Sequence, residues 1–407
     1  MNIIALEALT FGLGHLSSAA RKNGCRLTLL TRDKSVYDYE LSQQETGDVT
    51  VIELDTFNNE NVVAALQHEP DIAGILSTTD TWSFHCLEIS KKLGLPHHDP
   101  YVIGLVRDKY RLRNHLYNEG LSSCTSKLVN PRDYEREVVT ADVKYPCIVK
   151  DTAGTGSQYV WIAYNENDLL TVLDHASTQP LRGLLTIEPF FSGTLYSLET
   201  LSWEGETRLI AITSRVISPE PLFREEAFSS PVHFPDALMD SLETWIRKVL
   251  SSIGYQRGFA HTEFMITGDG FEVIEINPRL GGVQIGEALC RSFGINIYES
   301  WVEMALNKRP ELMDMHLRDK KGIGQLIVYA EQSGIFSHIE GLDRLVNHPG
   351  APVFYPTAVK GKRIDTIDDQ RASIGILLAE GDSSEIALLN AYAARNKLKV
   401  VMKSTDE

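Results

Sequence analysis

The chain has 407 residues, of which 43% are hydrophobic and 23% are charged, and its formal net charge is −16. This length predicts about two to four domains, and the acidic balance excludes nucleic acid as an expected partner, because phosphate-backbone binding needs clustered Lys and Arg. No run approaches about 18 apolar residues, so no contact with a membrane is expected, and five cysteines without CxxC spacing favour a reducing, cytoplasmic location.

The first hundred residues alternate between short apolar runs and segments with helical spacing. The predicted strands are Asn2–Leu6, Arg26–Thr31, Val49–Glu53 and Ile72–Ser77. The predicted helices are Leu13–Lys22, Glu60–His68 and Trp82–Leu93. This order indicates an α/β fold in which a parallel sheet carries helices on both faces.

From Tyr145 the pattern changes to one typical of antiparallel strands. A short Gly-bearing loop separates Tyr145–Lys150 from Gln158–Ala163, which predicts a hairpin. Further strands are predicted at Leu184–Phe190, Tyr196–Trp203 and Arg208–Val216, and further helices at Arg107–Glu119, Ala237–Ile253 and Ser384–Arg395. Ser218–Pro235 has four prolines and no clear periodicity, which is typical of a functional loop or of a mobile surface segment. A β-rich segment is predicted from Gly324 to the end.

A second hairpin is predicted where Phe259–Ile266 and Phe271–Asn277 flank a Gly-rich turn. A three-residue loop would pair Thr267 with Phe271, so that Glu263 lies opposite Glu275 and His261 lies opposite Asn277. A two-residue loop would instead place Glu275 on the other face of the hairpin, because side chains alternate along a strand.

Opposed carboxylates on neighbouring strands repel each other, so a fold that pairs them usually neutralises them with a cation. Glu263, Glu275 and the Asn277 carbonyl offer oxygen ligands only, which suit Mg²⁺ or Mn²⁺ and not zinc. Mg²⁺ commonly takes its remaining ligands from water and substrate phosphates, so this site also predicts a bound nucleotide. The alternative is that both glutamates are solvated strand residues.

The string Glu275-Ile276-Asn277-Pro278-Arg279 resembles the E-x-N-x-R signature of the ATP-grasp carboxylate–amine ligases. Within that superfamily the chain is most similar to the L-amino-acid ligases. The resemblance implies an ATP-grasp fold with a parallel α/β pre-ATP-grasp domain at 1–103. It also implies an ATP-grasp region at 104–314, with a lid subdomain near 122–188, and a β-rich C-terminal subdomain at 315–407.

The resemblance further implies which residues bind ATP. Lys109 and Lys150 match the family's phosphate lysines, and the loop after Lys150 resembles its phosphate lid. The implied ATP-binding residues are Lys109, Lys150, Gly154, Gly156, Ser157, Glu188, Phe190 and Phe191, with Glu188 at the hinge that reads the adenine edge. The sequence departs from the family at Leu195, because relatives commonly have an acidic residue there for the ribose hydroxyls.

The implied reaction joins a small-molecule carboxylate to an amine, with Arg279 stabilising the transferring phosphoryl group as the catalytic residue. The implied cofactors are ATP and Mg²⁺, as two ions for which Mn²⁺ can substitute. Candidate substrate-binding residues are Arg215, Arg224, Glu225, His233, Gly281 and Gly282. Members of the family commonly form homodimers, so a homodimer is one expected state.

Two other functions compete with this interpretation. Gly12-Leu13-Gly14-His15-Leu16-Ser17 follows a predicted strand and precedes a helix, which resembles part of the fingerprint of an NAD-dependent dehydrogenase. Its third glycine is replaced by Ser17, which leaves a two-glycine match. A nucleotide sensor that keeps the ATP-grasp fold without turnover is the other alternative.

Overall fold

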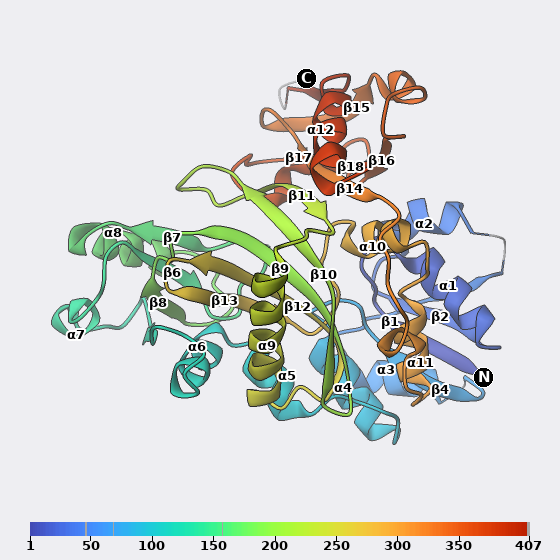
Figure 1. Cartoon of the computed structure of the whole chain (residues 1–407), viewed down its shortest axis with the longest axis horizontal. Coiled ribbons are helices and arrows are strands. Elements are labelled where there is room, and N and C mark those ends of the chain that lie inside the picture. Colours follow the sequence, from blue (N-terminus) through green and yellow to red (C-terminus); the bar gives the residue numbers. More distant parts are fainter. Residues whose placement is uncertain (45–46, 68, 157, 405–407) are drawn as a thin grey trace.

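The computed structural model describes residues 1–44, 47–67, 69–156 and 158–404. A four-stranded parallel sheet forms the N-terminal domain, which lies at the lower right of Figure 1. Its strands, in the order β3-β2-β1-β4, are β1 (Asn2–Leu6), β2 (Arg26–Thr31), β3 (Val49–Glu53) and β4 (Ile72–Leu76). All four predicted strands are therefore confirmed to within one residue.

Helices cover both faces of this sheet because β1 alternates its apolar side chains between two cores. Ile3 and Ala5 pack with one set of helices, whereas Ile4 and Leu6 pack with the other. The helices are α1 (Leu13–Lys22), α2 (Asp38–Ser42), α3 (Asn59–Leu66), α4 (Ser83–Lys92), α10 (Ile285–Phe293) and α11 (Glu299–Ala305). Helices α10 and α11 come from much later in the chain, so the N-terminal domain is completed by residues that follow the predicted metal hairpin.

A second, four-stranded sheet forms the predicted lid subdomain, called the lid below, which projects to the left in Figure 1. Its strands, in the order β5-β8-β6-β7, are β5 (Lys127–Val129), β6 (Cys147–Asp151), β7 (Val160–Ala163) and β8 (Leu185–Pro189), with helices α7 (Arg136–Thr140) and α8 (Glu166–Ser177). The predicted hairpin is confirmed, since β6 and β7 pair antiparallel. Strands β5 and β8 are neighbours, so the chain enters and leaves the lid side by side.

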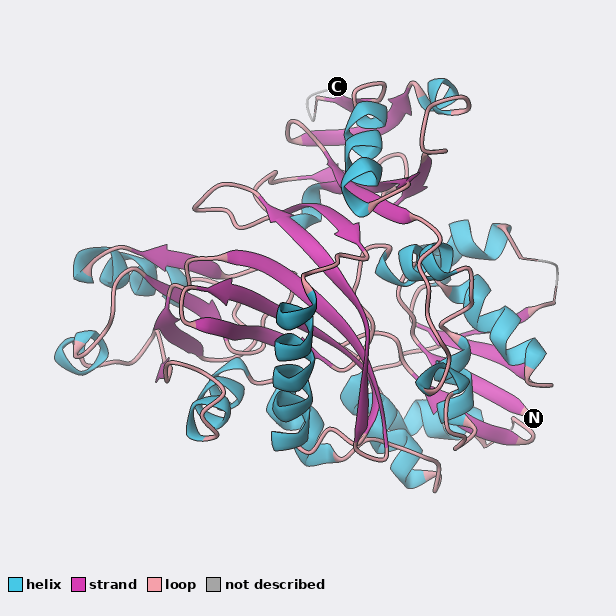
Figure 2. Cartoon of the chain, in the orientation of Figure 1, coloured by secondary structure: helices cyan, strands magenta, loops and turns pink. Residues whose placement is uncertain are grey.

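An eight-stranded sheet forms the centre of the molecule (Figure 2). Its strands are β9 (Thr194–Trp203), β10 (Glu206–Ile217), β11 (Glu225–Ser230), β12 (Arg257–Thr267), β13 (Gly270–Asn277), β14 (Gly322–Tyr329), β16 (Val353–Pro356) and β18 (Ser373–Gly381). Helices α5 (Pro100–Val106), α6 (Lys109–Asn118) and α9 (Asp236–Ser252) pack against it. The expectation of an irregular segment at Ser218–Pro235 is wrong for Glu225–Ser230, because β10 and β14 pair with that stretch as β11.

The C-terminal subdomain is β-rich, as expected, but it is continuous with the central sheet. Strands β14, β16 and β18 extend that sheet beyond β11. A separate three-stranded sheet of β15 (Gly334–Glu340), β17 (Arg363–Ile364) and β19 (Lys399–Lys403) and the helix α12 (Ser384–Arg395) complete the subdomain at the top of Figure 1. The sheet therefore connects the C-terminal residues directly to the strands of the ATP-grasp region.

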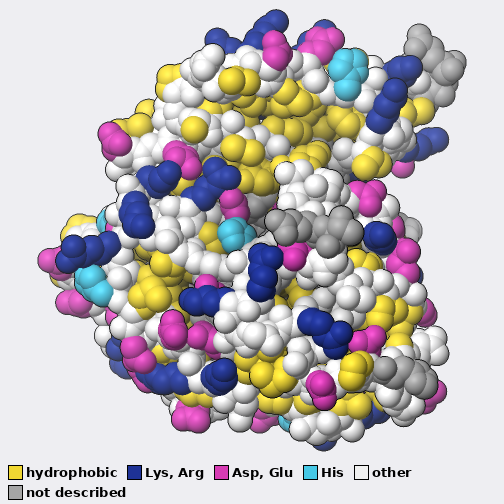
Figure 3. All heavy atoms as spheres, turned by 90° about the vertical axis from the view of Figure 1, so that its right-hand side faces the viewer, with side chains coloured by type: hydrophobic (Ala, Val, Ile, Leu, Met, Phe, Trp, Pro, Cys, Tyr) yellow, Lys and Arg dark blue, Asp and Glu magenta, His cyan; other side chains and the backbone are white. Residues whose placement is uncertain are grey.

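The surface drawn in Figure 3 has a mixed character. Hydrophobic side chains gather over its upper lobe, and acidic and basic side chains are interspersed over the rest. Among the helices in the described ranges, none is long and apolar enough to cross a membrane.

Glu287 on α10 joins the N-terminal domain to the C-terminal subdomain. Its Oε2 lies 2.6 Å from Nε2 of His15, and its Oε1 accepts from Nε of Arg291 at 2.6 Å. Arg291 in turn donates to the hydroxyl of Tyr355 at 2.8 Å. Although burial alone would raise the pKa of Glu287, the contacts with His15 and Arg291 hold it at about 2.

Replacing Glu287 with glutamine is expected to lower the Tm at neutral pH by about 2 °C, on the order of one lost ion pair. The folded-state pKa lies below the unfolded value of about 4.3, so the stabilising effect is complete above that value. It disappears as the pH falls toward about 2. Thermal unfolding of both proteins from pH 7 to 2 should show the Tm difference shrinking below about pH 4.5. A constant difference would contradict this role.

Candidate active site

The register of the β12–β13 hairpin brings two of the three predicted metal ligands, Glu263 and Glu275, opposite each other. Thr267 pairs with Gly270, so the turn has two residues, and the predicted three-residue turn is wrong. A β-bulge at Ile274 then shifts the register by one residue, because Phe264 pairs with Val273 whereas Glu263 pairs with Glu275. The predicted pairings at the site are therefore confirmed, although they arise from a bulge, which turns a strand's side chains to the other face.

The two paired carboxylates are each neutralised by cations of the protein. Glu263 Oε1 lies 3.1 Å from Nη2 of Arg215 and 3.5 Å from Nε2 of His261. Burial would raise the pKa of Glu263, but the positive charge of Arg215 holds it below its usual value despite the nearby Glu275. The first carboxylate is therefore ionised at neutral pH.

Glu275 is also ionised, but different residues stabilise its charge. Its Oε2 lies 3.2 Å from Nζ of Lys109, and its Oε1 accepts from Nδ2 of Asn277 at 2.8 Å. Burial opposes ionisation, yet Lys109 and the Asn277 hydrogen bond lower the pKa of Glu275 to about 2. Two ionised, paired carboxylates beside an amide are a donor set that fits a hard divalent cation.

This donor set is small for a metal site made by protein alone. Across the part of the chain that the structure describes, no cluster of three or more His, Cys, Asp or Glu side chains could hold a metal ion. Glu263, Glu275 and Asn277 would therefore hold Mg²⁺ only together with further oxygen ligands, such as phosphate, which is the usual mode for this ion.

A cavity of about 580 Å³ lies beside the hairpin, between the lid and the central sheet. The predicted residues that line it are Lys109, Lys150, Gly154, Gly156, Glu188, Phe190, Phe191, Arg215, Glu225, Glu263, Glu275, Arg279 and Gly282. Its volume is in the range of pockets that hold small ligands. Ser157, also predicted to bind ATP, lies outside the described residues.

The predicted phosphate lysines approach the cavity from two elements. Lys109 begins α6 and donates from Nζ to the carbonyl oxygen of Gly154 at 2.7 Å, which ties it to the predicted phosphate loop. Lys150 lies on β6 and is ion-paired with Glu188. Burial lowers the pKa of Lys150 more than Glu188 raises it.

The hinge segment predicted to bind adenine lines the same cavity. Both oxygens of Glu188 are engaged, one by Lys150 and the other by Arg113 at 3.0 Å. The backbone of the segment, and not this carboxylate, is therefore the part left to read a base edge. A Cβ on Gly193 would lie 2.2 Å from the carbonyl oxygen of Ile266, so this close approach requires glycine. Leu195 lines the cavity with an apolar side chain.

Arg279 is oriented by a residue that the sequence did not single out. Its Nε donates to Oδ2 of Asp80 at 2.7 Å, and its Nη1 donates to the carbonyl oxygen of Leu280 at 2.7 Å. The Asp80 carboxylate outweighs burial and raises the pKa of Arg279. Asp80 follows β4, and the carboxyl ends of parallel strands are where ligands bind in such sheets, which is the signal that could have identified it.

The predicted substrate-binding residues do not all meet. Arg215 and Glu225 form an ion pair at the cavity, where Gly282 also lies. Arg224 stacks on Tyr329 with its guanidinium carbon 3.9 Å from the ring centre, and it is not part of the cavity wall. His233 is exposed and lies 2.9 Å from Asp319, so the structure separates it from the site.

Two buried residues, of which His261 lines the cavity and Glu199 lies behind it, were also not predicted as a pair. Nδ1 of His261 lies 2.5 Å from Oε1 of Glu199, and Oε2 of Glu199 accepts from the backbone N–H of Gly281 at 3.0 Å. Gly281, predicted to bind substrate, is thus held by Glu199 and is not part of the cavity wall. Sequence spacing gave no signal for Glu199, because it lies on β9, which is distant in the sequence and pairs with β12 only in the folded sheet.

The Gly12–Ser17 motif is filled by the protein's own side chains. The backbone N–H of Gly14 donates to Oε2 of Glu40 at 3.1 Å, and a Cβ on Gly12 would lie 2.5 Å from the hydroxyl of Tyr298. A carboxylate thus occupies the helix N-terminus at which a dinucleotide would place its pyrophosphate. This arrangement weighs against the dehydrogenase interpretation.

Comparison with known proteins agrees with this geometry. A family model described as an ATP-grasp domain matches residues 143–287, and one described as L-amino acid ligase C-terminal domain 2 matches residues 326–403. The crystal structure of an L-amino acid ligase from Bacillus licheniformis is similar, with a TM-score of 0.83, 20% identity and coverage of 99% of both chains.

Two curated relatives are synthases by name. Carnosine synthase 1 of Mus musculus is 25% identical over 75% of this chain, and dapdiamide A synthase of Enterobacter agglomerans is 23% identical over 43% of it. The chain spans 40% of the length of the first and 43% of the second.

The fold is thus an ATP-grasp fold, and the expected resemblance is confirmed. The chain carries an ATP-grasp domain together with a C-terminal domain of the L-amino acid ligase type. It is related to the ATP-grasp carboxylate–amine ligases and is close to the amino-acid ligases. The prediction of an ATP-dependent ligase agrees with the names of these relatives and of this structural neighbour.

Proposed function

We propose that this protein is an ATP-dependent ligase that forms an amide or peptide bond between an amino acid-type carboxylate and an amine. The observation that carries the proposal is the pairing of Glu263 with Glu275 on the wall of a cavity that Lys109, Lys150 and Arg279 also line. Two ionised carboxylates facing several cations suit a metal-bound nucleoside triphosphate, whose phosphates need both kinds of partner.

In the proposed reaction, an oxygen of the substrate carboxylate attacks the γ-phosphorus of ATP, and the bond to the β,γ-bridging oxygen breaks to release ADP. The amine then attacks the acyl phosphate carbon, loses a proton, and expels phosphate. Mg²⁺ held by Glu263, Glu275 and Asn277 would neutralise charge on the phosphates during transfer.

The residues of the chain act mainly by binding and orientation in this scheme. Lys109 and Lys150 hold phosphate oxygens as point charges. Arg279, fixed by Asp80 on one edge, presents its remaining N–H groups to charge that develops on the transferring phosphoryl group and on the tetrahedral intermediate. No acid–base group is needed beyond one that accepts the proton of the amine.

The substrates are proposed to bind beside the ion pair of Arg215 and Glu225. A guanidinium suits a carboxylate, and a carboxylate suits an ammonium group, so this pair offers partners for both ends of an amino acid. Relatives named for L-amino acid ligation, carnosine synthesis and dapdiamide synthesis support amino acid-type substrates.

The proposal predicts that phosphate release requires ATP, Mg²⁺, a carboxylate and an amine together. We expect the rate with a productive amino-acid pair to exceed the rate with either amino acid alone by at least about tenfold, because the acyl phosphate needs the amine to turn over. A pairwise amino-acid screen with phosphate detection, followed by mass spectrometry of the products, measures this.

The screen also separates the competing functions. A condensed product with the mass of the pair minus water supports the ligase. Tight nucleotide binding without phosphate release for any pair would favour the non-catalytic sensor, and a product that is not an amide would require another reaction class.

A further inference from the structure

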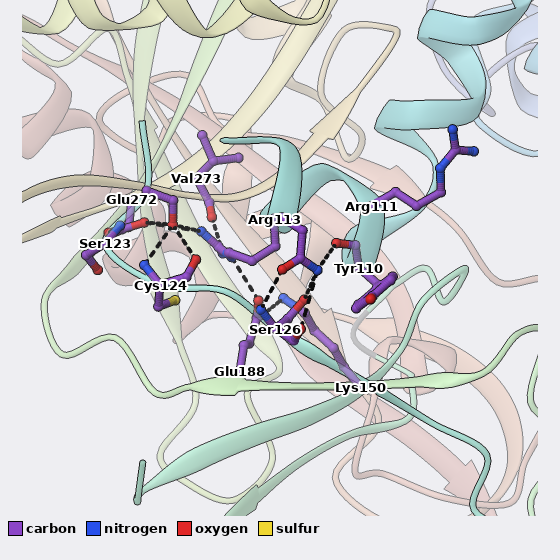
Figure 4. Close-up of polar contacts among 12 residues, drawn as sticks. Tyr110, Arg111, Arg113, Ser123, Cys124, Ser126, Lys150, Glu188, Glu272 and Val273 are labelled. Atoms are coloured by element: carbon purple, nitrogen blue, oxygen red, sulfur yellow. Dashed lines mark hydrogen bonds and ion pairs between the residues drawn. The ribbon is translucent and has the colours of Figure 1, made fainter. Parts of the chain in front are cut away.

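A buried cluster of four charged side chains joins the lid to the central sheet (Figure 4). Arg113 on α6 donates from Nε to Oε2 of Glu188 at 3.0 Å and from Nη1 to Oε2 of Glu272 at 3.2 Å. Lys150 contacts the other oxygen of Glu188. Each of the four side chains is at most 7% exposed, so two cations and two carboxylates balance one another away from water.

The cluster lies where the chain enters and leaves the lid. Ser122, just before β5, donates to Oε2 of Glu272 at 2.8 Å, and Glu188 is the penultimate residue of β8. Because β5 and β8 are paired neighbours, both crossings meet at Arg113. Its Nη2 also donates to the carbonyl oxygen of Val273 on the metal hairpin.

We propose that Arg113 is a positioning residue for nucleotide binding, because it keeps Glu188 paired when Lys150 turns toward the phosphates of ATP. This inference rests on the proposed function, in which Lys150 binds phosphate. In the present structure Lys150 is held by Glu188, although it also lines the cavity. Phosphate oxygens in the cavity would therefore compete with Glu188 for the ammonium group of Lys150.

Such an exchange is costly unless Glu188 keeps another cation. A buried carboxylate that loses its only partner is strongly destabilised, because neither water nor another charge replaces the lost interaction. Arg113 contacts the Glu188 oxygen that Lys150 does not use. The carboxylate thus remains paired while the ammonium group of Lys150 is released.

Without Arg113, Lys150 becomes the only cation on Glu188, and ATP must compete with that carboxylate for it. Replacing Arg113 with methionine is therefore expected to raise the Kd of a non-hydrolysable ATP analogue with Mg²⁺, and the KM for ATP, by at least about tenfold. The kcat at saturating ATP should stay within about threefold of the wild type, since Arg113 does not line the cavity. A merely structural role would leave the Kd and the KM for ATP unchanged, whereas the Tm is expected to fall in either case because two buried carboxylates lose a cation.

Calorimetric titration of the full chain with the ATP analogue provides the primary measurement. Arg113→Lys should give an intermediate Kd, because an ammonium group cannot bridge two carboxylates as a guanidinium does. In the double variant Arg113→Met/Glu188→Gln, the Kd should return to that of Glu188→Gln alone, because a neutral side chain no longer retains Lys150. Arg136→Met, which removes an exposed lid arginine paired with Glu166, is the matched control and should bind like the wild type.

A wild-type Kd in folded Arg113→Met, or a failure of Glu188→Gln to restore binding in the double variant, would overturn the proposal. If Arg113→Met does not fold, a wild-type Kd in Arg113→Lys has the same consequence. If the wild type binds nucleotide but joins no carboxylate to an amine, the proposed function fails while the titration still decides the role of Arg113. Absence of nucleotide binding by the wild type would overturn both.

Discussion

Replacing Glu275 with glutamine is expected to lower kcat by about 10³-fold. The reason is that a neutral amide cannot balance the positive charge of a metal ion held between this side chain and the phosphates. The change should leave the fold intact, since glutamine keeps the shape of the side chain and an oxygen that can accept from Lys109. Steady-state phosphate release at saturating ATP and substrates measures the loss. The Mg²⁺ concentration for half-maximal rate should rise at the same time.

The matched control is Glu340→Gln, which changes an exposed glutamate on β15. It removes the same charge from a strand outside the cavity and should keep the wild-type kcat. Wild-type activity in folded Glu275→Gln would contradict the metal assignment, whereas equal losses in both variants would point to the overall charge of the protein.

Replacing Arg279 with lysine is expected to lower kcat by about 10²-fold, because removing one preorganised donor from a site of developing charge costs that much in other enzymes. Lysine keeps the positive charge beside buried Asp80 but cannot contact it and the cavity with two separate edges. Stability should therefore change little. Phosphate release and thermal unfolding of the purified variant test both expectations.

Arg279→Ala is expected to lose activity at least as strongly and also to lose stability. It leaves Asp80 buried without its cation, and breaking a buried ion pair typically costs about 3–5 kcal/mol. Asp80→Asn provides the complementary test, since Arg279 remains but is no longer held by a carboxylate. An Arg279→Lys protein with the wild-type kcat would rule out the catalytic role of the guanidinium.

The β12–β13 hairpin was only partly predictable from local sequence. The pairing of Glu263 with Glu275 was predictable from strand alternation and an assumed turn, yet the turn was wrong. The structure reaches the same pairing through a two-residue turn and the bulge at Ile274. A bulge has no periodic signature in a sequence, because it depends on how both strands pack in the sheet.

Elements with strong local signals were predicted well. Helix α12 begins and ends at the predicted residues, and Ser383 caps it by accepting from the backbone N–H of Ile386. In contrast, β11 was missed inside Ser218–Pro235, because its pairing partners β10 and β14 come from distant parts of the chain. Strand propensity depends on such neighbours more than helix propensity does.

The sequence by itself determined the E-x-N-x-R string and the hairpin that carries it, because these depend on residue type and short spacing. The predicted phosphate lysines and the class of reaction were implied by the resemblance of that string to a family. Only the tertiary structure decided which cation faces which carboxylate. Arg113 meets Glu272 across 159 positions, and Arg279 meets Asp80 across 199. Such pairs form because buried charges must be balanced wherever packing brings them together, and no local period records that requirement.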